Sequence, residues 1–221
     1  FKIASCKYSS SSTTSFLGPA KSDGLQTICN NFSGSTLEFW LKKSAFGANN
    51  EREVIFDLWN QETSVSTKGR LRLELRPNTS EPIYLIWGSG SNGAELSVGG
   101  TLTDSDIKDD KWHHYAVSIA NVTTGMRVRL YRDGIMQSDQ TDSNVIDDIR
   151  GLTGGLNATL GSLISDPAGG SLVKGDGKLS GSMDEFRYWK KERTAREVGL
   201  NWFSQVGGGT DDYDYNVDLG V

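Results

Sequence analysis

The feature that most constrains this chain is the alternation of apolar and polar residues in short segments. Residues 70–76 read RLRLELR, which places three leucines on one side of an extended strand and charged side chains on the other. Successive side chains of a strand point to opposite faces, so this pattern is typical of a half-buried β-strand. Further strands are predicted at 36–43, 53–59, 82–88, 113–120, 126–134, 156–162 and 183–189. Clusters rich in glycine and serine separate these segments, which favours an all-β sandwich or barrel.

The composition agrees with such a fold and excludes several functional classes. The 221 residues include 26 glycines and only 4 prolines, as expected for many strands joined by tight turns. A net charge of −5 argues against nucleic-acid binding, which requires a basic surface. No run of 18 apolar residues occurs, so we expect no insertion into a membrane. The start at Phe1, without signal-peptide features, indicates a processed chain or a piece of a longer one.

A helix and a linker are predicted near the C-terminus. Thr194 and Glu197 have the spacing of a capping box, which predicts a short helix ending before the glycines at 207–209. Residues 207–221 are acidic and begin with glycines, as in a linker or the start of a further module. We therefore assign the domain to residues 1–206.

The two cysteines give little information about the fold. Cys6 and Cys29 are too few for a disulfide framework or a zinc site. One disulfide between them and two buried thiols both remain open alternatives.

Four segments in order resemble the laminin G-like, pentraxin-type branch of the concanavalin A-like lectin/glucanase superfamily. They are TLEFWLK, KWHHYAVSI, VRLYRDGIMQS and LSGSMDEFRYWKKERTAREV, spread over about 36–202. In the third segment, Asp133 and Gly134 predict a tight hairpin turn, because glycine tolerates the positive φ that such a turn needs. The resemblance implies a jelly-roll sandwich of two antiparallel sheets with one short C-terminal helix.

The same superfamily contains glycoside hydrolases, which need paired carboxylates. The resemblance implies a Glu-x-Asp-x-x-Glu string on one strand of an active glucanase, and this chain has none. Glu53 and Asp57 are expected to share a strand face, but they would lie about 13 Å apart. Catalysis requires roughly 5 Å between carboxyls for retention and about 6.5–9.5 Å for inversion. We therefore predict that the chain is not an enzyme, with a glycoside hydrolase as the less favoured alternative.

A structural calcium ion is the cofactor that the resemblance implies. In the family, the aspartate of the closing strand often joins calcium with oxygens from the beginning of the chain, which here implies Asp184 and Asp23. Asp184 stands on an otherwise apolar strand, where a buried carboxylate would need a partner. The sequence SSSSTTSFLGP replaces the Asp-Gly hairpin expected before Asp23. The aspartate-rich stretches 103–110 and 139–148 fit either solvated loops or calcium loops.

Ligand binding is predicted where aromatic rings lie beside amides and hydroxyls. A sugar has an apolar face and polar edges, so such combinations suit sugar recognition. The candidates are Trp59, Asn60, Tyr84 and Trp87, although both tryptophans could instead belong to the core. The other tryptophans are expected in the core: Trp40, Trp112, Trp189 and Trp202.

These observations predict a non-catalytic binding module of a larger extracellular or virion-associated protein. Its expected partners are glycans or proteins, together with neighbouring domains of a longer chain. The alternative is a purely structural module of a phage virion or tail protein, which the acidic, Ser/Thr/Gly-rich composition also suits.

Overall fold

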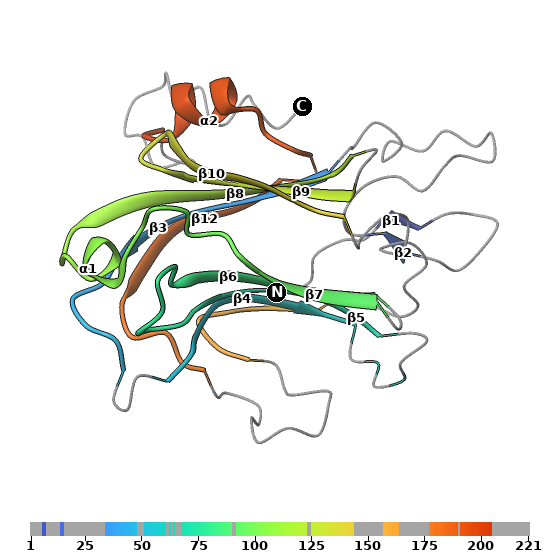
Figure 1. The fold of residues 1–221 in the computed structure, drawn as a ribbon, viewed down its shortest axis with the longest axis horizontal. Helices are drawn as coiled ribbons and strands as arrows, with labels where there is room; N and C mark the ends of the chain where they lie inside the picture. Colours follow the sequence, from blue (N-terminus) through green and yellow to red (C-terminus); the bar gives the residue numbers. More distant parts are fainter. Residues whose placement is uncertain are drawn as a thin grey trace, which may run out of the picture.

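The protein is a β-sandwich whose two antiparallel sheets pack face to face (Figure 1). The computed structural model describes residues 6–7, 14–15, 34–47, 51–60, 62, 64, 68–89, 92–122, 125–143, 157–163, 177–189 and 191–204. The architecture confirms the predicted jelly-roll sandwich. No helix among these residues is long and apolar enough to cross a membrane. Cys29, Asp23 and the predicted linker at 207–221 lie outside the described residues.

Each main sheet contains five strands. The first has the order β10–β9–β8–β3–β12, with β3 (Gly34–Lys42), β8 (Trp112–Val122), β9 (Gly125–Arg132), β10 (Ile135–Asp142) and β12 (Ser182–Trp189). The second has the order β11–β4–β5–β6–β7, with β4 (Glu53–Trp59), β5 (Gly69–Leu75), β6 (Ile83–Ser89), β7 (Asn92–Ser97) and β11 (Asn157–Leu160). The short strands β1 (Cys6–Lys7) and β2 (Thr14–Ser15) pair with each other.

The core lies between the two sheets and follows directly from the alternation in the sequence. The three leucines of β5 are fully buried, and they belong to one cluster with Leu37 and Phe39 of β3. Burial of such a side chain contributes about 1.5–3 kcal/mol relative to exposure. The arginines and the glutamate that alternate with these leucines consequently occupy the outer face of the second sheet.

The predicted strands are all present, and the structure adds elements that the sequence did not indicate. β7 was not predicted: it begins within the glycine-rich cluster at 88–93, whose residues have little strand propensity, and pairing with β6 forms the strand. Residues 103–110 include a one-turn helix, α1 (Asp104–Ile107), whose Ile107 is buried in the core. The hairpin turn is confirmed, since Asp133 and Gly134 both have positive φ.

A bulge in β4 corrects the expected placement of two carboxylates. The register with β5 shifts between Val54 and Phe56, so the alternation changes phase within the strand. Glu53 consequently opposes Leu75 on the inner side, whereas Asp57 opposes Arg72 on the outer face. The two carboxylates therefore do not share a face, contrary to the prediction.

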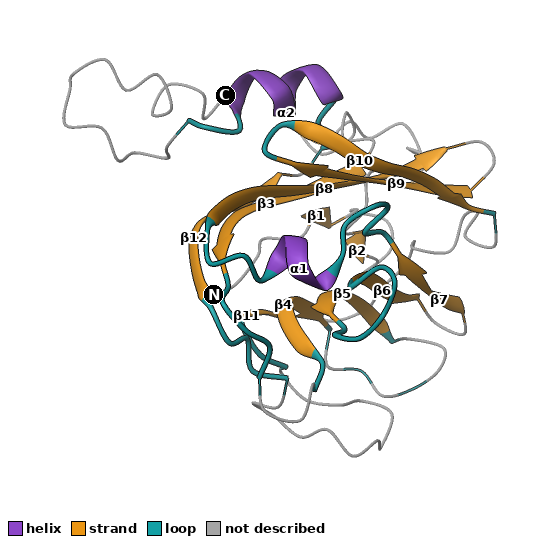
Figure 2. Cartoon of the chain, turned by 60° about the vertical axis from the view of Figure 1, so that its left-hand side comes forward, coloured by secondary structure: helices purple, strands orange, loops and turns teal. Residues whose placement is uncertain are grey.

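The C-terminal helix α2 (Ala195–Asn201) lies on the outer side of the first sheet (Figure 2). Its capping box is confirmed: the Thr194 hydroxyl accepts from the Glu197 backbone N–H, and the Glu197 carboxylate accepts from the Thr194 N–H. Burial acts to raise the pKa of Glu197, but hydrogen bonds from Lys191 and Thr194 lower it to about 2. The helix ends at Asn201, earlier than the glycines expected to stop it.

Candidate functional site

The outer face of the second sheet, here called the charged face, gathers polar and aromatic side chains from β4–β7. It comprises the residues that alternate with the core positions: Asp57, Trp59, Arg70, Arg72, Glu74, Tyr84, Ile86 and Glu95. Cross-strand pairing places Arg72 between Asp57 and Ile86, and Glu74 opposite Tyr84. The charged face is therefore one continuous surface built by the period of the strands.

One end of the charged face is held by a buried ion pair. Arg70 donates to both carboxylate oxygens of Asp57, over 2.7 and 2.8 Å, and its guanidinium lies 5.5 Å from the centre of the Trp59 ring. The Trp59 indole donates to the Glu62 carbonyl at 3.2 Å. Asp57, Trp59 and Arg70 are each at most 5% exposed. These three side chains form a rigid support rather than an open binding surface.

The middle of the charged face is organised by the buried carboxylate of Glu74. Arg76 donates its Nε to Glu74 at 2.5 Å, and the Nε of Arg72 lies 2.9 Å from the other carboxylate oxygen. Arg76 also pairs with Glu95 at 2.8 Å and lies 4.1 Å from the centre of the Tyr84 ring. Glu74 is therefore shared between Arg72 and Arg76, and of these two only Arg76 has a second carboxylate partner among the described residues.

Arg72 is the arginine on this face that is least committed to internal contacts. Its side chain is 12% exposed, and it forms no hydrogen bond with any described residue despite its ion pair with Glu74. Burial lowers the pKa of Arg72, Glu74 counteracts that effect, and the positive charge of Arg70 adds to it. An anion near the exposed part of the Arg72 guanidinium would relieve the crowding of positive charge.

The four predicted ligand-binding residues separate into different environments. Trp87 points into the core, and its indole N–H has no hydrogen-bond partner among the described residues. This placement does not agree with a surface role for Trp87. Asn60 is buried, and its side-chain oxygen accepts from the backbone N–H groups of Glu62 and Gly69. Tyr84 is half-buried on the charged face, so it is the predicted residue that a ligand can reach.

Arg72 was not among the residues predicted from the sequence to bind a ligand. Its position on the polar side of RLRLELR was evident, but the segment contains three arginines with the same alternation. Only the hydrogen bonds of the folded protein distinguish Arg70 and Arg76, which donate to carboxylates, from Arg72, which has an ion pair but no hydrogen bond to a described residue.

Asp184, the predicted calcium ligand, lies at the rim of a cavity of about 400 Å³. It is exposed rather than buried, because β12 has a bulge between Asp184 and Arg187. Its Oδ1 accepts from the backbone N–H of Glu185 at 2.8 Å. The cavity walls are mostly carbon, whereas calcium prefers six to eight oxygens, so the described residues alone do not make a calcium site. With Asp23 outside the described residues, calcium stays a prediction.

The aspartates of 103–110 take structural roles in and after α1. Asp106 accepts from both the backbone N–H and the hydroxyl of Thr103 and so caps the helix. Asp109 lies 2.9 Å from one ring nitrogen of His113, whose other nitrogen lies 2.6 Å from Asp133. Within the described ranges, no three His, Cys, Asp or Glu side chains are grouped to hold a metal ion.

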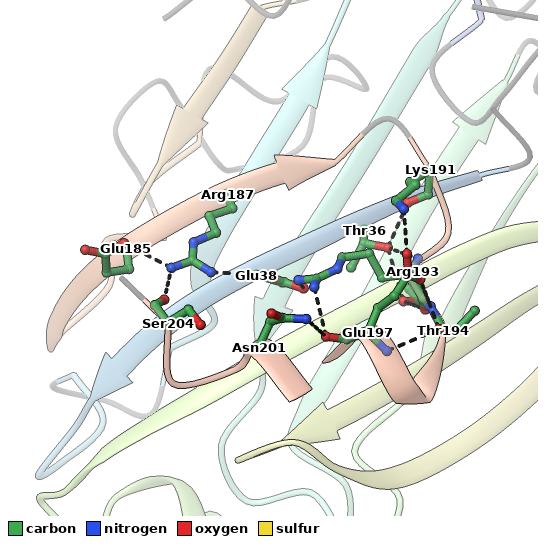
Figure 3. Close-up of polar contacts among 11 residues, drawn as sticks. Thr36, Glu38, Glu185, Arg187, Lys191, Arg193, Thr194, Glu197, Asn201 and Ser204 are labelled. Atoms are coloured by element: carbon green, nitrogen blue, oxygen red, sulfur yellow. Dashed lines mark hydrogen bonds and ion pairs between the residues drawn. The ribbon is translucent and has the colours of Figure 1, made fainter. Parts of the chain in front are cut away.

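A second polar cluster lies beneath α2, on the outer face of the first sheet (Figure 3). The fully buried Glu38 accepts from Arg193 through one oxygen and lies 3.8 Å from Arg187 through the other. Arg193 also donates to the Glu197 carbonyl at 2.9 Å, and Arg187 donates to the Ser204 carbonyl. This cluster attaches the C-terminal segment to the sheet and leaves no open surface around Glu38.

Comparisons with known proteins agree with the fold. A family model described as the concanavalin A-like lectin/glucanases superfamily matches residues 19–199. A heptameric SAP-like pentraxin from Limulus polyphemus is 14% identical with a TM-score of 0.50, covering 85% of this chain and 79% of that one. The CBM40 of a Ruminococcus gnavus IT-sialidase is 11% identical with a TM-score of 0.50, covering 76% and 82%.

The same fold also occurs within a larger enzyme. The K499G mutant of NanB sialidase from Streptococcus pneumoniae is 18% identical with a TM-score of 0.51; the match covers 83% of this chain but 27% of that one. At these identities the likeness establishes the fold. No curated protein matches the sequence.

Proposed function

Because the chain belongs to the concanavalin A-like lectin/glucanases superfamily, we propose that it is a non-catalytic module that binds an acidic glycan on its charged face. The observation that carries this proposal is Arg72, a half-buried guanidinium that forms no hydrogen bond with a described residue. Beside it, Tyr84 and Ile86 are half-buried and provide apolar contact area. A sugar that bears a carboxylate or sulfate fits this combination.

The relatives in structure support a carbohydrate ligand. The same Ruminococcus gnavus CBM40 has been solved bound to α2,3 sialyllactose, and that structure has a TM-score of 0.50 to this chain. Sialyllactose carries a carboxylate, so it is a suitable probe for Arg72. The ligand of that protein is used here as a test compound, since 12% identity transfers the fold alone.

The state of the carboxylates favours binding over hydrolysis. Asp57 is engaged bidentately by Arg70, and Glu74 accepts from Arg76, so both buried acids are held as ion-pair partners. A glycosidase needs two carboxylates that can reach the scissile bond, whereas these two are buried and committed to guanidinium groups. A glycoside hydrolase of this fold is the alternative, and release of reducing sugar from glycans would support it.

We also propose where the module acts and what it contacts. An extracellular or virion-surface position would bring the module to acidic glycans, with neighbouring domains supplying other activities. A protein ligand and a purely structural role in a phage virion or tail are the competing proposals. They predict no binding to free glycans.

The test is calorimetric titration with 3′-sialyllactose and with lactose as the uncharged control. We expect binding of sialyllactose but not of lactose, and weakening of about tenfold or more in Arg72→Gln, because a hydrogen bond to a charged group contributes about 1.5–3 kcal/mol. Tyr84→Ala should also weaken binding. Arg129→Gln is the matched control, since Arg129 lies on β9 of the other sheet. If the protein binds no glycan on an array of acidic glycans, the result would favour the purely structural module.

A further inference from the structure

We propose that the cavity beside Asp184 is a second binding site, which takes a small organic cation: an amine carried on an apolar body. The cavity lies between the start of β12 and the end of β11, which are edge strands of different sheets. It is separate from the charged face, which lies on the outer side of β4–β7. Its lining residues are Leu160, Gly161, Leu179, Gly181, Met183, Asp184, Glu185 and Phe186.

The walls of the cavity are an outward extension of the hydrophobic core. Phe186 stacks on the buried Phe56 with ring centres 5.3 Å apart, and Leu179 and Met183 pack against the same core cluster. Leu160 completes the wall and is 44% exposed. Since the core holds these side chains in place, the apolar surface is formed before any ligand arrives.

The rim of the cavity is acidic. The bulge in β12 gives Glu185 a φ of 51° and brings two successive carboxylates to the mouth. No Lys or Arg is among the described residues that line the cavity. Asp184 forms no ion pair within the described part of the chain.

Arg187 and Lys43, two basic residues near the cavity, form ion pairs with carboxylates other than Asp184. Arg187 contacts Glu185 at 3.3 Å and also binds Glu38 and the Ser204 carbonyl. The buried ammonium of Lys43 donates to Glu53 at 2.5 Å and to the Ser180 carbonyl at 2.6 Å. Neither pairs with Asp184, so the carboxylate of Asp184, without an ion pair to any described residue, is the charge at the mouth that a ligand can reach.

The combination of walls and rim selects the chemical class. A ring or short alkyl chain fits a cavity of about 400 Å³, and its burial against the apolar walls is favourable. An ammonium group on that body would reach Asp184 at the rim and could approach the Phe186 ring for a cation–π contact. A bare metal ion would leave the carbon walls unused, and an anion would be repelled.

The test is a titration of the labelled protein followed by NMR, with benzylamine as the probe. Benzyl alcohol and benzoate are the neutral and anionic analogues of the same size. We expect saturable shifts at Met183 and Phe186 with benzylamine, and binding at least about fivefold weaker for the two analogues. Asp184→Asn should weaken benzylamine by about fivefold as well, whereas Asp139→Asn, on the opposite edge strand β10, should match the unmodified protein.

Two further variants keep the outcome interpretable. Leu160→Trp places a larger ring at the exposed wall and should block benzylamine without affecting the buried core. Arg72→Gln should retain benzylamine binding, so loss of glycan binding and loss of this site are separable. Equal binding of benzyl alcohol, an unchanged affinity in Asp184→Asn, or displacement of benzylamine by calcium would each overturn the proposal.

Discussion

The outer faces of the two sheets contain the same arrangement of side chains, but the arginines in it have different further partners. Each face has a buried glutamate between two arginines: Glu38 with Arg187 and Arg193 on the first sheet, Glu74 with Arg72 and Arg76 on the second. Under α2, the guanidiniums of the first face also bind the carbonyls of Ser204 and Glu197. On the charged face, Arg72 has no such acceptor among the described residues.

The difference is what we expect if the first face is structural and the charged face is the proposed binding face. Guanidinium groups that bind both a buried carboxylate and the carbonyls of another segment fix that segment to the sheet. A guanidinium with unused donors near the surface instead retains the capacity to bind an anion.

Glu38→Gln should be the most destabilising of these changes. It removes the carboxylate between Arg187 and Arg193, whose side chains are only 9% and 6% exposed, and leaves two positive charges with little access to water, which costs about 3–5 kcal/mol of unfolding free energy. The matched change Glu74→Gln should cost less, about 1–3 kcal/mol, since Arg72 and Arg76 are partly exposed and can be hydrated. Urea denaturation measures both, and equal losses would contradict the distinction between the two faces.

Acid should loosen the structural face through His114. The ring is 1% exposed, has no hydrogen bond to its nitrogens among described residues, and lies 5.7 Å from the Trp40 ring and 6.4 Å from Trp202. Burial lowers its pKa from 6.5 to about 4, with a further contribution from Arg187. As the pH falls, the unfolded chain is protonated first, so stability decreases between pH 6.5 and about 4.

The loss attributed to His114 should reach about 3 kcal/mol. The measurement compares the urea midpoint at several pH values for the unmodified protein and His114→Phe. The variant removes the titrating group but keeps a ring between the two tryptophans. Stability curves with the same pH dependence for both proteins would show that His114 is not responsible.

Removing the helix cap should have a moderate effect confined to the structural face. Thr194→Ala deletes the hydroxyl that accepts from the Glu197 N–H, which costs about 1 kcal/mol. Thermal or urea unfolding detects that loss. Because α2 lies on the sheet opposite the charged face, affinity for 3′-sialyllactose should not change. A parallel loss of affinity would mean that the faces are coupled.

Arg72→Gln should have the smallest effect on stability. Arg76 continues to pair with Glu74, so we expect a change of about 0.5–1 kcal/mol or less. Paired with the loss of glycan binding, this result would identify Arg72 as a binding residue. A loss comparable to that of Glu38→Gln would instead place Arg72 in the structural framework.

Local pattern was sufficient for the strands and the helix cap. The leucines of 70–76 and the box of Thr194 and Glu197 act through neighbours in sequence, so their consequences are readable from the chain. The candidate site was predicted less completely. Tyr84 lies on the charged face as a ligand would require, but Trp87 faces the core. The residues around an aromatic side chain in a strand do not show whether it faces the core or the outside. The register of the strand in the sheet decides this.

The two-layer β architecture follows from the amino-acid pattern alone, because alternation at period two requires one apolar face per sheet and a partner to cover it. Which polar groups pair with one another depends on the folded structure. The bulge in β4 moved Glu53 away from Asp57, and the bulge in β12 exposed Asp184. Ion pairs join residues far apart in the chain, such as Glu38 and Arg193. A local sequence pattern cannot predict such contacts. The state of Arg72 follows from these long-range contacts.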